Sequence, residues 1–177
     1  MMTGPSSDRV VGFYRGGRDE AGRTLSNILS WDDDRLEAVH DYIQWVFPTR
    51  RPSGVNAAAP LVTQSTVEAF ASDPALRGGL RRALDRLLAF YGLRRLDAGD
   101  AGRIEIDPAR FETRRRVWLH PGNHNHLRLT RIMQSLSELG LPEEAGALQR
   151  CLLEDVAPGP GEGLVTGRTL EFWRAAV

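Results

Sequence analysis

The chain has no lysine, a single cysteine and no long apolar run. Its 23 basic residues are all arginine and are balanced by 23 acidic residues, so no net charge draws it to nucleic acid or to an anionic membrane. One cysteine excludes an internal disulfide, and no segment approaches the ~20 apolar residues that a membrane-spanning helix requires. The N-terminus also lacks the apolar core of a signal peptide. We therefore expect a cytoplasmic protein.

The absence of lysine is typical of the codon usage of a GC-rich genome. Selection for bidentate anion binding would instead place arginine at a few sites and lysine elsewhere. Arginines are dense over residues 77–95 and 114–116. The first stretch lies opposite the apolar stripe of a predicted helix, which indicates a solvated face. With a neutral total charge, this argues against a nucleic-acid partner.

Signatures of catalysis are also missing. The sequence contains no glycine-rich phosphate loop and no serine nucleophile elbow. Cys151 lies in an apolar helical stretch beside Leu148 and Leu152, which is typical of a small buried core residue. We therefore expect no cofactor, and a non-catalytic protein is favoured over an enzyme.

The apolar residues recur mainly at helical spacing, which predicts an all-α protein of about seven helices. A chain of 177 residues fits one compact domain, with residues 1–12 as a flexible N-terminus and residues 13–177 as the helical domain. The strongest pattern is a helix that starts at Asp73-Pro74 and stops before Gly92. Ile104 and Ile106 alternate with a polar residue, so residues 93–106 form either a small hairpin or an extended loop.

The other helix boundaries follow from capping residues, proline and glycine. One helix is expected from a capping segment at 30–33 to Phe47, because Pro48 disfavours helical dihedrals in the residue before it. An irregular loop is expected over 49–62. Further helices are expected over 25–29, 65–70, 107–118, 125–139, 142–156 and 166–176.

The run from Asn123 to Ile132 is the most unusual in the chain, because two amides, two imidazoles and two guanidiniums gather at the start of a predicted helix. Asn123 or Asn125 can cap the helix. Arg128 and Arg131 can bind a carboxylate or phosphate in a bidentate manner. A structural ion pair to Asp41, or to one acidic residue of 32–34, is the favoured alternative for these arginines.

A second unusual run, His40–Pro48, can pack against the first. Asp41 and Gln44 would then meet Arg128 and Arg131, and Trp45 would supply apolar contact. The candidate partner is an unknown protein, a peptide or a small anionic ligand. The candidate ligand-binding residues are Asp41, Gln44, Trp45, Asn123, His124, Asn125, Arg128 and Arg131.

Four histidines offer an alternative, a metal-dependent or other enzyme built on His40, His120, His124 and His126. Three imidazoles and an open water position suit catalytic zinc. However, residues two apart on a helix point about 200° away from each other, and His126 falls on the apolar face. We therefore predict no metal site, with His126 packed in the core and His124 hydrogen-bonded at the helix start. A third interpretation is that both runs only hold the fold together.

The segments Tyr42–Pro48, Asn125–Ile132 and Ser135–Gly140 resemble the conserved domain of the opioid growth factor receptor family. The similarity covers roughly residues 13–155, and the tail 172–177 resembles bacterial members. The resemblance implies an all-helical domain, and in animals the family is linked to enkephalin-type peptides, the nuclear envelope and growth control. It implies no catalytic residue, and its tolerance of tyrosine at the His126 position fits a packing aromatic.

The leading hypothesis is therefore a non-catalytic binding module. Its recognition surface lies between the predicted His40–Phe47 helix and the start of the 125–139 helix. The oligomeric state is left open.

Overall fold

The computed structural model describes residues 8–96 and 102–177. Within them the chain forms ten α-helices, a π-helical segment and a two-stranded antiparallel sheet, which confirms a mainly helical domain with a small hairpin inside 93–106. The helices outnumber the seven expected because four have only four to six residues. The elements are α1 (Arg9–Tyr14), α2 (Leu25–Leu29), α3 (Asp33–Ala38), α4 (Ile43–Val46), α5 (Gln64–Ser72), α6 (Pro74–Tyr91), β1 (Leu93–Arg95), β2 (Ile104–Ile106), α7 (Phe111–Trp118), α8 (His124–Glu138), α9 (Pro142–Arg150), η1 (Cys151–Val156) and α10 (Gly167–Arg174).

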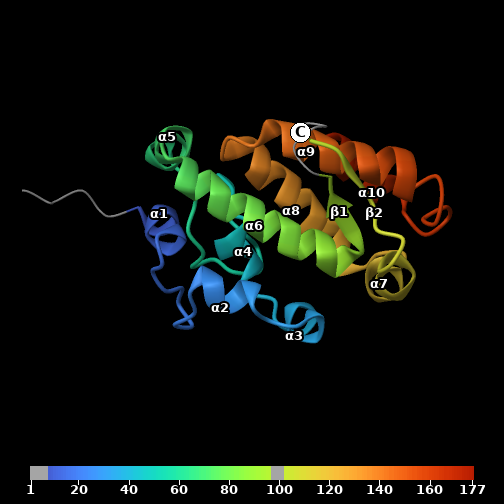
Figure 1. Cartoon of the computed structure of the whole chain (residues 1–177), viewed down its shortest axis with the longest axis horizontal. Coiled ribbons are helices and arrows are strands. Elements are labelled where there is room, and N and C mark those ends of the chain that lie inside the picture. The colour runs from blue at the N-terminus through green and yellow to red at the C-terminus, as the bar shows by residue number, and fades with distance from the viewer. Residues whose placement is uncertain (1–7, 97–101) are drawn as a thin grey trace, which may run out of the picture.

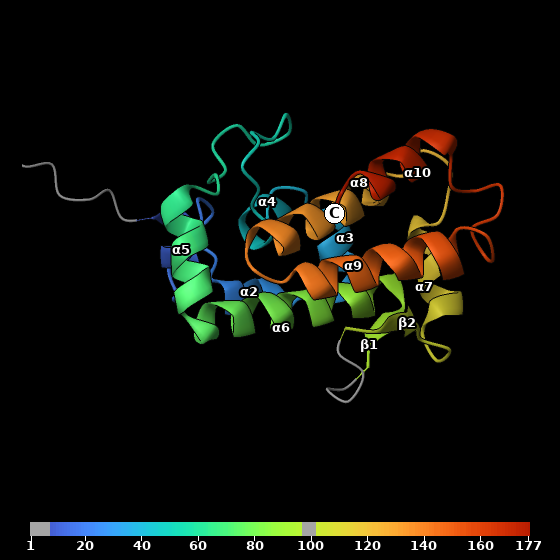
Figure 2. The same ribbon diagram turned by 90° about the horizontal axis from the view of Figure 1, so that it is seen from above.

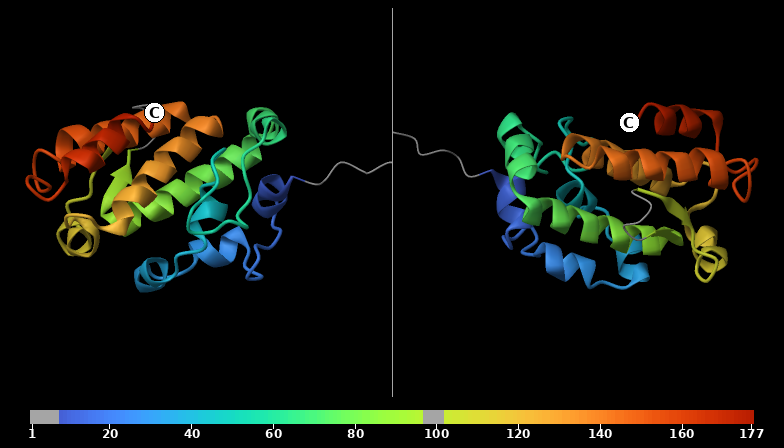
Figure 3. Two further views of the ribbon diagram at one scale, coloured as in Figure 1. Left: turned by 180° about the vertical axis from the view of Figure 1, so that it is seen from behind. Right: turned by 45° about the horizontal axis from the view of Figure 1, so that its top comes forward.

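Helix α6 runs through the middle of the molecule (Figure 1). Helices α1, α2 and α3 lie on one side of it, α9 and α10 lie on the other, and the views in Figure 3 agree. Helices α8 and α9 form an antiparallel pair joined by a tight turn, with α10 beside α8 (Figure 2). None of the helices in the part of the chain that the structure describes has the length and apolar character to cross a membrane.

The central helix α6 has the boundaries that its sequence predicts. The carboxylate of Asp73 accepts a hydrogen bond from the amide of Ala75 at 2.9 Å, and Pro74 takes the first helical position. Gly92 ends the helix with a φ of 76°. A side chain there would place its Cβ 2.7 Å from the Cα of Phe111, so this glycine also allows α7 to pack closely against the end of α6.

The predicted single helix from the 30–33 cap to Phe47 is wrong. Asp32 caps α3 as expected, but the backbone turns extended at Val39 (φ −93°, ψ 131°) and helical structure resumes only at Ile43. The break leaves carbonyls at the end of α3 without helical partners. The hydroxyl of Tyr42 donates to one of them, the carbonyl of Leu36, at 3.1 Å. The guanidinium of Arg128, far along the sequence, donates to the carbonyls of Leu36 and Val39, as described for the candidate site.

Two other helices begin away from their predicted residues. Helix α5 begins at Gln64 because Thr63, rather than Ser65, is its cap and accepts from a backbone amide three residues on. Helix α7 begins at Phe111 rather than at 107, because the Asp107 carboxylate accepts from the amide of residue 109 and stabilises a separate turn.

The described part of the N-terminal segment begins with the cap residue Asp8. Its carboxylate accepts from the amides of Val10 and Val11 at 3.0 and 3.1 Å and caps α1. Residues 8–12, predicted as part of a flexible N-terminus, therefore cap and begin a helix whose Val10 and Phe13 are 1% exposed. Residues 1–7 lie outside the described residues.

The C-terminal third follows the predicted pattern. Helix α9 begins at Pro142 and continues through η1 to Val156. Cys151 is 1% exposed at the junction of these two elements, and burial raises the pKa of its thiol to about 12. Helix α10 docks through Trp173, which is fully buried and donates from its indole to the carbonyl of His126 at 3.2 Å.

Candidate functional site

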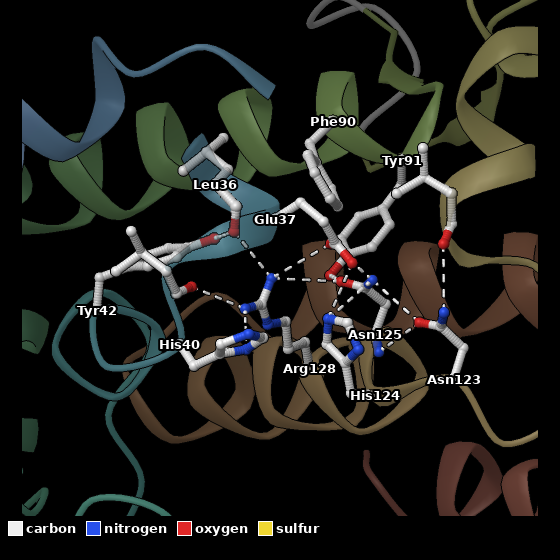
Figure 4. A network of polar contacts seen from close by, with 12 residues as sticks. Leu36, Glu37, His40, Tyr42, Phe90, Tyr91, Asn123, His124, Asn125 and Arg128 are labelled. Atoms are coloured by element: carbon white, nitrogen blue, oxygen red, sulfur yellow. Dashed lines mark hydrogen bonds and ion pairs between the residues drawn. The ribbon is translucent and has the colours of Figure 1, made fainter. Parts of the chain in front are cut away.

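Arg128 reaches from the first turns of α8 to the end of α3 and is 6% exposed. Its Nη1 donates to the carbonyl of Leu36 at 3.0 Å and its Nη2 to the carbonyl of Val39 at 2.9 Å (Figure 4). The closest carboxylate among the described residues, that of Glu37, lies 3.8 Å away. Arg128 thus caps the broken end of α3. The predicted ion pair with Asp41 or with residues 32–34 is not formed.

The two asparagines are bound within the protein. Asn123 caps α8 by accepting from the amide of Asn125 at 2.9 Å, as predicted. Asn125 is fully buried and its Nδ2 donates to the carboxylate of Glu37 at 3.0 Å. Its Oδ1 lies 3.4 Å from both the Tyr91 hydroxyl and Nη1 of Arg128. These amides therefore join α3, α6 and α8.

His40 and His124 lie edge to face, with ring centroids 5.2 Å apart. Nη2 of Arg128 is 3.1 Å from Nδ1 of His40. A guanidinium only donates, so Nδ1 of His40 is the acceptor in this contact. Nε2 of His124 is 3.1 Å from the carboxylate of Glu37. Burial lowers the pKa of His124, and the Glu37 charge partly opposes that fall.

Two tyrosines line the inner side of this network (Figure 4). Tyr42 and Tyr91 are fully buried. Burial raises the pKa of Tyr42 to about 12 even though Arg128 lies beside it, and it raises the pKa of Tyr91 as well. Both hydroxyls stay protonated at neutral pH, so they serve as hydrogen-bond donors to the network.

A pocket of about 830 Å³ opens on the outer side of the same network. It lies between α4, the 49–55 loop, the outer face of α8 and the end of α10. Its lining residues are His40, Ile43, Gln44, Thr49, Arg51, Pro52, Ser53, Gly54, Val55, His124, Leu127, Arg128, Thr130, Arg131, Gln134, Ser137, Glu138, Phe172, Ala175 and Ala176. Three of them are exposed large apolar residues: Val55 is 78% exposed, Leu127 61% and Phe172 40%.

Several polar groups in the pocket lack full partners, among them the buried hydroxyl of Ser137. Gln44 is 4% exposed, and its Oε1 has no hydrogen-bond partner among the described residues. Arg131 is half-buried, and its Nη1 makes only long contacts, 3.3 Å to the carbonyl of Phe47 and 3.4 Å to the hydroxyl of Thr49. Burial lowers the pKa of Arg131, and Glu138 partly opposes that effect.

The predicted site residues thus divide into two groups. Four of them line the pocket, and these are Gln44, His124, Arg128 and Arg131. Asp41 is exposed and pairs with Arg23 at 2.8 Å, away from the α8 arginines that it was expected to meet.

Trp45 does not supply the pocket's apolar contact. It is 4% exposed and packs against Phe13 and Arg9. Asn123 and Asn125 lie inside the polar network described above.

The four histidines do not converge. His40 and His124 are neighbours, but His126 is 3% exposed and lies between the rings of Trp118 and Trp173. His120 instead contacts the carbonyl of Arg116. Within residues 8–96 and 102–177, no group of three or more histidine, cysteine or acidic side chains has the arrangement of a metal site.

Sequence reasoning missed much of the pocket wall. For residues 49–55 the sequence predicts only an irregular loop, and nothing in the composition of this loop indicates that it faces α8. Phe172 lies in the predicted last helix, and it is exposed while its neighbour Trp173 is buried. Leu127 is the clearest available signal, because it is an apolar residue on the polar side of an otherwise amphipathic helix.

The arginine-dense stretch over 77–95 is largely paired. Its carboxylate pairs are Arg81–Glu144, Arg86–Asp33, Arg94–Glu105 and Arg95–Asp85. Asp33 also lies 3.2 Å from Arg110 and 3.5 Å from Arg114, and so connects α3 to both α6 and α7. These pairs neutralise much of the charge on this face.

Comparison with known proteins identifies relatives of the whole helical region. The model of the opioid growth factor receptor (OGFr) conserved region matches residues 22–177. The chain is 42% identical over 139 residues to the opioid growth factor receptor of Rattus norvegicus, which covers 76% of this chain and 23% of that protein. The Homo sapiens receptor gives the same identity over 20% of its own length. Opioid growth factor receptor-like protein 1 of Mus musculus is 33% identical over 125 residues, 70% of this chain and 26% of that protein.

No solved structure matches the chain. The chain spans about a quarter or less of the length of these relatives. The family model nevertheless covers most of the chain, including the polar network around Arg128 and every residue that lines the pocket. The chain therefore belongs to the family of the opioid growth factor receptor conserved region.

Proposed function

We propose that this chain is a non-catalytic binding module whose pocket between α4 and α8 holds a peptide that carries a negative charge. Arg131 is the observation that carries the proposal. Its guanidinium is half-buried in the pocket wall, and among the described residues no carboxylate lies within 4 Å of it. Its counter-charge, Glu138, acts from beyond that distance. A partly buried charge without a close counter-charge is unfavourable, so a ligand carboxylate would stabilise it.

The rest of the wall favours a peptide over a small inorganic anion. Val55, Leu127 and Phe172 expose apolar surface at the pocket, and a concave site with apolar walls and few polar groups is typical of an organic ligand. The relatives from Rattus norvegicus and Homo sapiens are named opioid growth factor receptors, and a receptor's task is binding. The bacterial origin and cytoplasmic location inferred from composition stay predictions.

Arg128 has a different role in this proposal. Its donors are already used by the carbonyls of α3, so it shapes the pocket floor while Arg131 contacts the ligand. This assigns the ligand-binding role to one of the two arginines of the motif and the structural role to the other.

The test is capture of peptides from a soluble random-sequence hexapeptide pool, followed by affinity measurement on the enriched peptides. We expect wild-type protein to enrich peptides, and Arg131→Gln to weaken their binding by roughly tenfold or more, because a charge-assisted hydrogen bond is lost. Arg150→Gln is the matched control, since Arg150 is exposed on α9 and outside the pocket. The proposal fails if wild type enriches no peptide, or if Arg131→Gln binds the same peptides equally well.

A further inference from the structure

We infer that His40 and His124 form a pH-sensitive contact, which holds the segment 39–42 between α3 and α4 against α8 and releases it in acid. The two rings lie edge to face, with centroids 5.2 Å apart (Figure 4). One ring belongs to the segment between the helices, and the other belongs to the first residue of α8. The contact is part of the fold itself and requires no ligand.

His40 can accept a hydrogen bond from Arg128 only while its ring is neutral. Nη2 of Arg128 donates to Nδ1 of His40 at 3.1 Å and to the carbonyl of Val39 at 2.9 Å. A proton on Nδ1 replaces the acceptor with a second donor and places an imidazolium directly beside the guanidinium. His40 is exposed, so water can deliver that proton. Protonation therefore breaks the contact and repels the segment 39–42 from α8.

The charge of the network is balanced only when both imidazoles are neutral. Arg128 is its cation, and the carboxylate of Glu37 lies 3.8 Å away. Glu37 also lies 3.1 Å from Nε2 of His124 and accepts from the side-chain amide of Asn125 at 3.0 Å. A first proton on His124 can share this carboxylate. After a second proton on His40, three cations share one carboxylate, and like charges this close destabilise the packed arrangement.

The surrounding groups supply no unengaged carboxylate among the described residues. Asp41, next to His40, pairs with Arg23 at 2.8 Å. Tyr42 and Tyr91, on the inner side, stay protonated because burial raises the pKa of each hydroxyl. The other charged groups that line the pocket with the two histidines are Arg51, Arg131 and Glu138, and Glu138 accepts from the backbone amide of Arg50 at 2.8 Å.

The direction of the effect follows from linkage. Burial lowers the pKa of His124, and Arg128 and His40 lower it as well, while Glu37 partly opposes them. The packed arrangement therefore binds a proton less readily than the released one, in which the ring is solvated. Release takes up protons, so its population rises as the pH falls. Acid thus frees the segment 39–42 and the adjoining start of α4, whose Ile43 lines the pocket.

Amide exchange of the full chain at pH 7.5 and 5.5, followed by NMR, tests this release. Protection factors remove the pH dependence of intrinsic exchange. The reporters are the amides of Val39 and Val46, which donate to the carbonyls of Arg35 and Tyr42 at 3.1 Å. Between the two pH values we expect their protection to fall about tenfold more than that of α6, which reports the global effect of His126. An equal loss in α6, or no loss at the reporters, overturns the inference.

A double substitution, His40→Gln with His124→Gln, separates protonation from packing. Glutamine offers both a donor and an acceptor to replace the imidazole contacts, and it takes up no proton in this range. The double variant should keep the wild-type protection at pH 7.5 and lose the difference between the two pH values. His120→Gln is the matched control and should behave as wild type, because His120 contacts the carbonyl of Arg116 outside the network. A double variant with the wild-type pH response contradicts the role of the two histidines.

Ring NMR of the wild-type histidines is an independent check that needs no variant to fold. Two imidazoles that share one carboxylate titrate as a coupled pair. The Cε1 protons of His40 and His124 should therefore each show two steps, and the second step should coincide with the loss of protection at Val39. Single, independent steps for these two rings, like that of His120, also overturn the inference.

Discussion

Arg128 and Arg131 are of the same type and one helical turn apart, yet their surroundings give them opposite roles. Arg128 is 6% exposed and donates to two carbonyls at 2.9–3.0 Å. Arg131 makes only contacts of 3.3–3.4 Å. The difference arises from α3, whose broken end faces Arg128. We therefore expect substitutions at the two positions to affect different properties.

Arg128→Ala should lower the free energy of unfolding by about 3 kcal/mol, because the carbonyls of Leu36 and Val39 lose buried donors. Arg131→Ala, the matched control, should cost less than about 1 kcal/mol, since its contacts are long and its burial is partial. Urea titration followed by circular dichroism measures both. Equal losses for the two variants would contradict the division of roles.

The surroundings of His126 change the pKa of its imidazole. Burial lowers its pKa below the ordinary 6.5, although the Trp118 carbonyl partly opposes this. The unfolded chain therefore takes up a proton at a higher pH than the folded chain does. The free energy of unfolding should fall as the pH decreases from 7 toward 5.5.

The comparison of wild type with His126→Phe isolates this contribution to the pH dependence. Burial also lowers the pKa of His124, so the variant should keep part of the slope. We expect a shallower dependence of stability on pH for His126→Phe over the same window, measured by chemical denaturation at each pH. An unchanged slope would show that His126 is protonated equally in both states.

At the scale of elements, α10 has one buried residue, Trp173. Trp173 is fully buried and bonded to the His126 carbonyl, whereas the adjacent Phe172 is 40% exposed at the pocket. The helix has eight residues, too few to be stable without packing. Its position, and with it one wall of the pocket, therefore depends on the indole.

Trp173→Ala should lower the free energy of unfolding by about 3–5 kcal/mol, the usual cost of deleting a buried tryptophan. Amide exchange along α10 should increase more than exchange in α6. Phe172→Ala is the control: it should change stability by less than about 1 kcal/mol and weaken peptide binding if its exposed ring is part of the proposed site. Hydrogen-exchange mass spectrometry follows the helices separately. Uniform exchange changes over the whole chain would argue against local release of α10.

The boundaries of some elements can be predicted from the sequence, and the boundaries of others cannot. Helix α6 carries its own start and stop signals, Asp73-Pro74 and Gly92, and both are used as predicted. The break between α3 and α4 has no comparable local signal, because the apolar stripe continues across it. The bonds that favour the break come from Arg128, 89 residues further along the chain from Val39. A local pattern cannot contain that information.

At the scale of the whole molecule, the single cysteine reports on global unfolding. Cys151 is 1% exposed in the core, and burial raises its thiol pKa to about 12. Reagents require the thiolate and access to it. We expect the folded protein at pH 8 to react with a disulfide reagent only at the rate of opening, and the protein in urea to react at once. Rapid stoichiometric labelling without denaturant would contradict this packing.

The sequence by itself determined the helical class, most helix boundaries and the packed role of His126, because these depend on periodicity, capping and local geometry. It left open whether 93–106 forms a hairpin and which of Asn123 and Asn125 is the cap. It also carried the motifs that define the family. Only the tertiary structure decided which polar residues of those motifs form their hydrogen bonds within the protein. Arg128 and Asn125 are buried against α3, whereas Gln44 and Arg131 keep unused hydrogen-bonding capacity at a pocket. The physical reason is that hydrogen-bond partners come from segments distant in sequence, and only folding brings them within reach.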